Sequence, residues 1–176
     1  MCLRLIPALI LTLGLTAAGN ERPPDEYRVK AAFLFNFAKF VEWPPEAFAD
    51  PNEALVVCVL GEDPFGHALD ELAMGKRIEG RVLAIRRISD AHLAKGCRML
   101  FVSSSEHKRV LSVLDSLGEP GVLTVGESDS ATSEGMIISF TLENGKVRFA
   151  INVAAAEREK LRLSSRLLSL ATRVRK

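Results

Sequence analysis

The sequence predicts a three-layer α/β/α fold whose mostly parallel sheet is extended by a C-terminal antiparallel hairpin. Two observations carry this prediction. Apolar, β-rich segments alternate with helical ones between residues 54 and 126, a spacing typical of right-handed β-α-β units in a parallel sheet. After Gly126 the pattern changes to two β-rich segments joined by Asn144-Gly145, a pair that favours a tight hairpin turn. The hairpin is therefore expected to add antiparallel strands at one edge of the sheet.

The first predicted helix spans residues 25–43 and is unusually rich in aromatic residues. Acidic residues occupy its first turn, where they favour the positive end of the helix dipole, and Pro44-Pro45 ends it. Phe33, Phe37 and Phe40 recur on one face. A helix that is apolar over so much of its circumference is either buried in the core or shared with a partner. Both interpretations stay open at this point.

The remaining elements follow in order along the chain. Continuous apolar runs indicate central strands that are buried on both faces, and the segments between them have helical patterns. The predicted strands are 54–60, 81–88, 97–102, 122–126, 136–142 and 146–152, and the predicted helical segments are 65–74, 90–95, 106–117 and 154–174.

The N-terminal 18 residues have the pattern of a secretory signal peptide. Arg4 precedes an apolar run over residues 5–15, and small residues follow it, where a signal peptidase could cleave. The run is too short to cross a bilayer comfortably, which argues against the alternative of a retained anchor. The sequence therefore predicts a signal peptide over residues 1–18, a linker over 19–24 and one exported domain over 25–176.

Charge and residue composition exclude several classes of function. Arg4 is the only charged residue of the signal peptide, so the 23 basic and 22 acidic residues of the whole chain become 22 of each after export. A neutral chain without a basic stripe argues against nucleic-acid binding. His67, His92 and His107 are too widely separated to suggest a metal site. We therefore expect neither a nucleic-acid partner nor a metal.

Two segments carry residue types that recur in catalytic or ligand sites. Residues 61–66 join a strand to a helix, the place where open α/β sheets bind ligands, but they lack the GxGxxG spacing and contain two acidic residues. Residues 103–107 bring three serines near a histidine without a Gly-x-Ser-x-Gly elbow. We interpret the first as a structural turn and the second as the start of a helix. No catalytic residue, no cofactor and no enzymatic activity is predicted.

Cys58 and Cys97 are the two cysteines that remain after export. An even pair in an oxidising compartment favours a disulfide over two free thiols. Such a bond would enclose about 40 residues and contribute roughly 3–4 kcal/mol to stability through loop-closure entropy. A permanent staple and a redox switch are both compatible with the pattern.

Residues 27–44, from Tyr27 to Pro44, resemble the opening helix of the YfiR-like family, and the resemblance extends over essentially the whole exported chain. The opening helix and the closing Ser-Ser-Arg-Leu-Leu segment are its most distinctive parts. The further segments that resemble the family, in order, are 58–61, 64–66, 101–105, 122–127, 145–152 and 163–168.

The resemblance implies a periplasmic repressor in cyclic di-GMP signalling. Such a protein would bind the periplasmic sensing domain of an inner-membrane diguanylate cyclase, lower cyclic di-GMP and biofilm formation, and be sequestered by an OmpA-like outer-membrane lipoprotein under envelope stress. It also implies a homodimer and two disulfides, of which Cys58 and Cys97 match one, while residues 132–139 lack the cysteines of the other. The alternative is a periplasmic ligand-binding sensor module for another membrane receptor, such as a histidine kinase.

Aromatic and arginine-rich surfaces are the predicted places of partner or ligand binding. Arginines near the hairpin and the last helix offer guanidinium groups to a small anionic ligand or to an acidic patch of a partner. A solvated cationic helix face is the alternative interpretation of these residues. The candidate residues are Phe33, Phe37, Trp43, Arg148, Asn152, Arg162, Ser164, Ser165 and Arg166.

Overall fold

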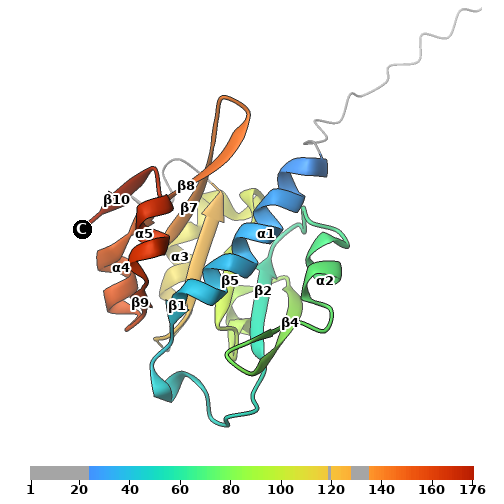
Figure 1. The fold of residues 1–176 in the computed structure, drawn as a ribbon, viewed down its shortest axis with the longest axis vertical. Coiled ribbons are helices and arrows are strands. Elements are labelled where there is room, and N and C mark those ends of the chain that lie inside the picture. Colours follow the sequence, from blue (N-terminus) through green and yellow to red (C-terminus); the bar gives the residue numbers. More distant parts are fainter. Residues whose placement is uncertain (1–23, 119, 128–134) are drawn as a thin grey trace, which may run out of the picture.

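The computed structural model describes residues 24–118, 120–127 and 135–176. Within them, a mostly parallel eight-stranded sheet has helices on both faces and ends in an antiparallel hairpin (Figure 1), so the predicted fold class is confirmed. The strands of this sheet are β2 (Leu55–Leu60), β3 (Arg77–Ile78), β4 (Arg81–Ile88), β5 (Met99–Val102), β6 (Leu123–Glu127), β7 (Ile138–Glu143), β8 (Lys146–Asn152) and β10 (Arg173–Arg175).

The strands lie in the order β10-β8-β7-β6-β5-β2-β4-β3. Neighbours from β4 to β7 are parallel, β8 is antiparallel to β7, β3 is antiparallel to β4, and β10 returns parallel to β8. From β2 the chain first moves to β4 on one side and then builds β5, β6 and β7 on the other. The order of the strands therefore reverses between β2 and β5, the position where open α/β sheets usually bind ligands.

Helices cover both faces of the sheet. The first helix crosses one face together with the second, and the third covers the opposite face (Figure 1). A small separate sheet pairs β1 (Val41–Glu42) with β9 (Arg162–Leu163). The α-helices are α1 (Pro24–Phe40), α2 (Ala68–Ala73), α3 (Val110–Asp115), α4 (Val153–Arg158) and α5 (Ser165–Leu170), and the 3-10 helices are η1 (Pro45–Ala47), η2 (Ala91–Ala94) and η3 (Ser104–Arg109).

Two hydrophobic cores explain why the central strands are apolar throughout. Side chains alternate between the faces of a strand. Val57 and Val59 of β2 accordingly join the core beneath α1, whereas Cys58 and Leu60 join the core beneath α3. Each of these side chains is at most 3% exposed. A strand buried on both faces needs apolar residues at every position, as the sequence pattern predicted.

The prediction of one C-terminal helix over residues 154–174 is wrong. The segment forms α4, β9, α5 and β10 in succession. Lys160 has a left-handed backbone with φ of +56°, which ends the first helix, and the Ser164 hydroxyl begins a new one by accepting a hydrogen bond from the Leu167 amide. Leu161 and Leu167 are both buried, but Leu161 lies between α4 and β9, whereas Leu167 lies on α5. The apolar residues of this segment thus have a helical spacing although the segment does not form one continuous helix.

Other predicted elements differ at their boundaries. The first helix ends at Phe40 and not at residue 43, because Val41–Glu42 pair with β9. The helix predicted for 106–117 begins as η3 and becomes α-helical only at Val110. The Asn144-Gly145 hairpin is confirmed, and both turn residues have positive φ, 50° and 72°, as a tight β-hairpin turn requires.

The predicted signal peptide and most of the predicted linker lie outside the described residues, which begin at Pro24. Among the helices of the described part, none is both long and apolar enough to span a membrane.

Candidate functional site between the first helix and the hairpin

A groove of about 560 Å³ separates the first turns of α1 from the β7–β8 hairpin. Both elements project from the same end of the molecule (Figure 1). Val29 on the helix is 44% exposed and Leu142 on the hairpin is 56% exposed. Apolar side chains therefore reach solvent on both sides of the groove. We call this site the helix–hairpin groove; its lining residues are Asp25, Glu26, Val29, Phe33, Leu142, Gly145, Lys146, Val147 and Arg148.

Aromatic packing holds α1 against the hairpin. The Phe37 ring centre lies 5.0 Å from that of Phe149 and 5.6 Å from that of Phe140, and Phe33 lies 5.5 Å from Phe149. Phe37 is 1% exposed, so it belongs to the core, whereas Phe33 is only partly buried and also lines the groove. Of these two predicted binding residues, Phe33 is the one that a partner can contact directly.

Charges of both signs surround the apolar surface of the groove. Asp25 and Glu26 lie on the helix side, and Lys146 and Arg148 lie on the hairpin side. A small anionic ligand would meet the two carboxylates as well as the cations. An apolar centre with a polar, mixed-charge rim is the usual anatomy of a protein–protein interface. Within the described residues, no group of three or more His, Cys, Asp or Glu side chains could hold a metal ion.

A buried ion cluster anchors the start of α1 beside the groove. Lys30 is 5% exposed, and its Nζ lies 2.5 Å from Glu26 Oε1 and 2.6 Å from Glu127 Oε1. Tyr27 lies beneath the ammonium, with its ring centre 4.6 Å from Nζ. Burial lowers the pKa of Lys30, but hydrogen bonds to Glu127 and Glu26 outweigh it, and the pKa is raised above its ordinary value. The cluster ties Glu26, a groove residue, to the end of β6.

The other predicted binding residues lie elsewhere. Trp43 follows β1 and is partly buried, and its indole Nε1 donates to the Arg98 carbonyl at 3.1 Å. Asn152 is 5% exposed, and its Oδ1 accepts a hydrogen bond from the Ala155 amide at the start of α4. Both residues hold structural elements together. The sequence did not distinguish these structural contacts from surface contacts.

Arg162, Ser164, Ser165 and Arg166 gather on β9 and α5, near the carboxyl end of α1. Arg166 lies over the Phe40 ring, 5.4 Å from its centre, and Arg162 lies 3.9 Å from a Glu42 carboxylate oxygen. Arg148 lines the groove at the opposite end of this helix, whose 17 residues span about 25 Å. Arg162, Ser164, Ser165 and Arg166 therefore lie near one another. Arg148 lies apart from them, in the groove.

The crevice at the reversal between β2 and β5 is filled by the protein itself. Gly61 has φ of +88°, and a Cβ atom there would lie 2.8 Å from Glu106 Cγ. The Glu62 amide donates to Ser105 Oγ at 3.1 Å, and Ser103 Oγ accepts from the Ser105 amide, so Ser103 caps η3. These contacts agree with the interpretation of both segments as turn and helix start.

Cys58 and Cys97 form a disulfide, as predicted, with their Cα atoms 5.8 Å apart. Cys58 lies on β2, and Cys97 lies two residues before the start of β5. Both cysteines are 0% exposed. The Arg86 guanidinium donates to Cys97 Sγ at 3.0 Å and to the Lys95 carbonyl at 2.7 Å. The disulfide is therefore part of the packed core beneath η2 and α3.

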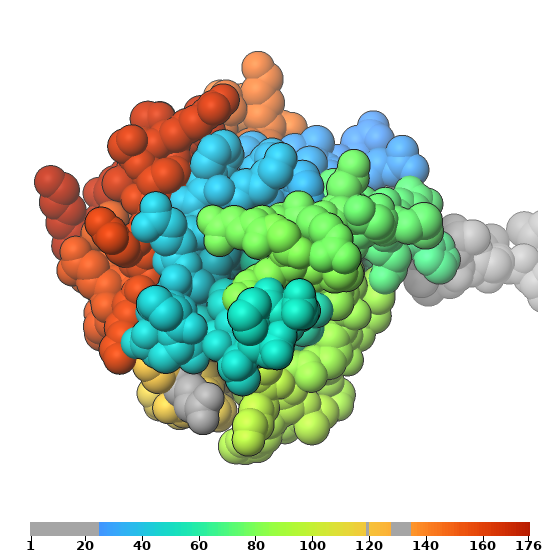
Figure 2. Space-filling model, turned by 60° about the horizontal axis from the view of Figure 1, so that its bottom comes forward, coloured from blue at the N-terminus to red at the C-terminus, as the bar shows by residue number. Residues whose placement is uncertain are grey.

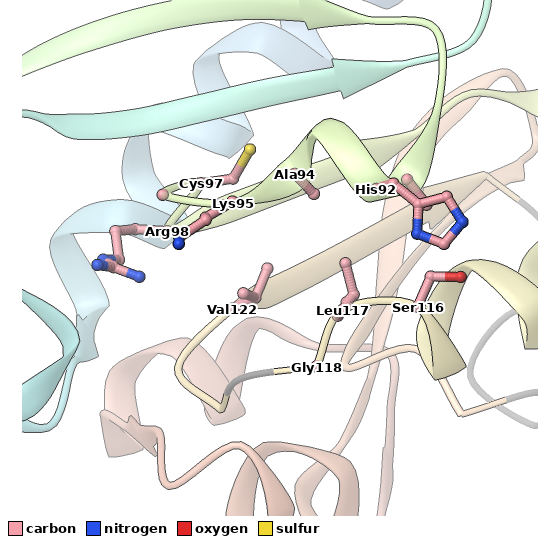
Figure 3. Close-up of a pocket in the computed structure, with 11 residues that line it drawn as sticks. His92, Ala94, Lys95, Cys97, Arg98, Ser116, Leu117, Gly118 and Val122 are labelled. Atoms are coloured by element: carbon pink, nitrogen blue, oxygen red, sulfur yellow. The ribbon is translucent and has the colours of Figure 1, made fainter.

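A second cavity, of about 220 Å³, lies beside the disulfide (Figure 3). His92 and Ser116 lie at one end and Arg98 at the other, and the sulfur of Cys97 points away from Leu117. The cavity therefore does not expose the bonded sulfur atoms, in agreement with their complete burial.

The model of the YfiR/HmsC-like family matches residues 27–172, which include most of α1, the disulfide, the hairpin and α5. The chain belongs to this family. The YfiR/HmsC-like family is regulatory rather than catalytic, and membership indicates a periplasmic regulator of cyclic di-GMP signalling.

Solved structures support the fold. A conserved domain protein from Vibrio cholerae O1 biovar El Tor is 13% identical, with a TM-score of 0.55, and the match covers 85% of this chain and 60% of that one. The ABC domain from Streptococcus pneumoniae, solved in complex with L-Trp, is 10% identical with a TM-score of 0.52 and the same coverage. This chain thus spans about 60% of the length of either neighbour. No curated protein sequence matches.

Proposed function

We propose that this YfiR/HmsC-like protein is a periplasmic repressor, which binds the periplasmic sensing domain of an inner-membrane diguanylate cyclase through the helix–hairpin groove. Family membership supports the regulatory role. The observation that carries the choice of site is the exposure of Val29 and Leu142 on opposite sides of one groove. Binding there would hold the cyclase inactive and lower cyclic di-GMP and biofilm formation.

The groove has the properties that an anchor residue of a partner needs. Phe33 forms part of its lining and is itself fixed by the Phe37 and Phe149 rings, so the surface is rigid before binding. A rigid apolar site loses little conformational entropy when a partner docks. The exposed Asp25 on one side and the cations Lys146 and Arg148 on the other would orient the partner through charge complementarity, whereas Glu26 is paired with Lys30.

Release completes the proposed cycle. An OmpA-like outer-membrane lipoprotein would sequester the repressor under envelope stress, and opening of the Cys58–Cys97 bond would give a redox route. A homodimer would present two copies of the groove.

Replacing Leu142 by serine is expected to weaken binding of the cyclase domain about fivefold or more. The substitution removes an apolar group that a partner would bury, and interface anchors of this kind contribute more than about 1 kcal/mol each. Titration calorimetry of the purified protein against the periplasmic domain of a diguanylate cyclase from the same genome measures the change.

Leu111→Ser is the matched control. Leu111 lies on α3 and is 63% exposed, so its replacement makes the same chemical change outside the groove. Equal affinity of the wild type and Leu142→Ser would exclude the groove. Absence of any binding to the cyclase domain would contradict the repressor proposal and favour the sensor-module alternative.

A further inference from the structure

The charges of this chain are strongly polarised along the sequence. Residues 146–176 contain nine Lys and Arg residues against two Glu residues, a local net charge of +7. The remaining residues contain 14 basic and 20 acidic side chains, a net charge of −6. The overall charge of +1 conceals this separation, so the expectation that the chain has no basic stripe does not hold for residues 146–176. Charge asymmetry on this scale favours an anionic macromolecular surface as a binding partner of the basic part.

In the fold, part of this basic segment lies on one side of the molecule. The basic segment forms the hairpin's second strand, α4, β9, α5 and β10, and its last elements make up one flank of the molecule, across α1 from the strand β4 (Figure 2). β10 is the outermost strand of the sheet. Arg173 and Arg175 thereby lie along a sheet edge, and both side chains are exposed.

Seven of these nine cations are exposed and form no ion pair within the described part of the chain, and four of the seven lie on α5 and at β10. We call them the basic edge: Arg166 on α5 and Arg173, Arg175 and Lys176 on and after β10. Other cations of the segment are partly neutralised, since Lys160 lies 3.5 Å from a Glu46 oxygen. The basic edge therefore keeps its positive charge available to a partner.

Apolar side chains accompany these cations. Leu170 is 57% exposed and Val174 is 39% exposed, and Val174 lies between the two arginines of β10. No residue of the basic edge lines any of the three cavities, of about 220, 300 and 560 Å³, that the described residues form beside the disulfide, beside α3 and at the helix–hairpin groove. The basic edge therefore suits a partner with an extended surface better than a small anion, because small ligands bind in concave sites.

We infer that the basic edge binds the anionic phosphate surface of a lipid bilayer. Guanidinium groups match phosphate oxygens in a two-pronged geometry, and exposed apolar residues among cations are typical of proteins that lie on membranes. Nucleic acid does not fit the periplasmic location that the family indicates. This inference does not depend on the helix–hairpin groove, because no residue of the basic edge lines that groove.

Replacing Arg173 and Arg175 together by glutamine is expected to weaken binding to anionic vesicles roughly 30-fold. Each cation near such a surface raises the binding affinity about fivefold. Cosedimentation of the purified protein with phosphatidylcholine vesicles, with and without phosphatidylglycerol, measures the change. Wild-type protein should bind only the vesicles that contain phosphatidylglycerol, and added salt should release it.

Lys76→Gln with Arg77→Gln is the matched control. These two exposed cations lie at the opposite edge of the sheet, at β3, and their replacement removes the same charge. Equal weakening by both double variants, or absence of wild-type binding to anionic vesicles, would overturn the inference. If the β10 variant instead lost only binding to the cyclase domain, the edge would serve an acidic protein and the bilayer assignment would be wrong.

Discussion

Replacing Lys30 by methionine is expected to lower the free energy of unfolding by about 3–5 kcal/mol. The ammonium is buried and contacts both Glu26 and Glu127, whose side chains are 12% and 5% exposed. Methionine fills a similar volume but leaves two carboxylates in a poorly solvated site without their cation. Urea unfolding near neutral pH, followed by circular dichroism, measures the loss.

The effect should depend on pH in a defined direction. Because the pKa of Lys30 is raised in the folded state, its contribution is complete below the ordinary lysine pKa and disappears as the pH rises through the folded value. The difference between wild type and Lys30→Met should therefore be constant around neutrality and shrink only in strongly alkaline solution. A difference that instead grew with alkaline pH would contradict this account.

Lys39→Met provides the control on the same helix. Lys39 is exposed, and its main contact is with the Phe35 ring, 4.8 Å away. Its replacement should cost less than about 0.5 kcal/mol. Adding Glu127→Leu to Lys30→Met should recover part of the lost stability, since it removes one stranded carboxylate. A cost of Lys30→Met similar to that of Lys39→Met would show that the cluster does not anchor α1.

The parts of the fold that were predictable from the sequence are those set by local patterns. The two-sided burial of β2 requires an apolar residue at each position, and the hairpin turn requires positive φ at Asn144 and Gly145, so both left a clear signature. The C-terminal segment has an ambiguous sequence pattern. The left-handed backbone at Lys160 and the Ser164 cap divide this segment into separate elements, and the spacing of the apolar residues indicates neither of them.

The candidate site was predictable only in part, because its exposure depends on contacts between distant segments. Phe33 was a candidate from its aromatic helix face, but Leu142 was not. Within the described residues, β6 pairs with β7 as far as Phe140, and Leu142, nearer the hairpin tip, is 56% exposed. Glu127 lies 97 residues from Lys30, so no local pattern could indicate their contact.

Replacing Cys58 and Cys97 together by alanine is expected to cost about 4 kcal/mol of unfolding free energy. The bond spans a sequence separation of 39 residues, and closing a loop of that length restricts the unfolded chain by this amount. Urea unfolding of the oxidised protein and of the double variant gives the difference directly. A loss below about 1 kcal/mol would mean that the bond contributes little to stability.

The rate of reduction of the Cys58–Cys97 bond separates a staple from a switch. Both sulfur atoms belong to residues that are 0% exposed, so a dissolved thiol can attack only after the core beneath η2 opens. Reduction by dithiothreitol under native conditions should therefore be slower by orders of magnitude than reduction in urea, with alkylation and mass spectrometry as the readout. Such protection would favour a permanent staple, because a stress signal would have to open the core before it reached the bond. Fast reduction of the native protein would instead require a low-energy opening near Cys97 and would support redox-controlled release of the cyclase.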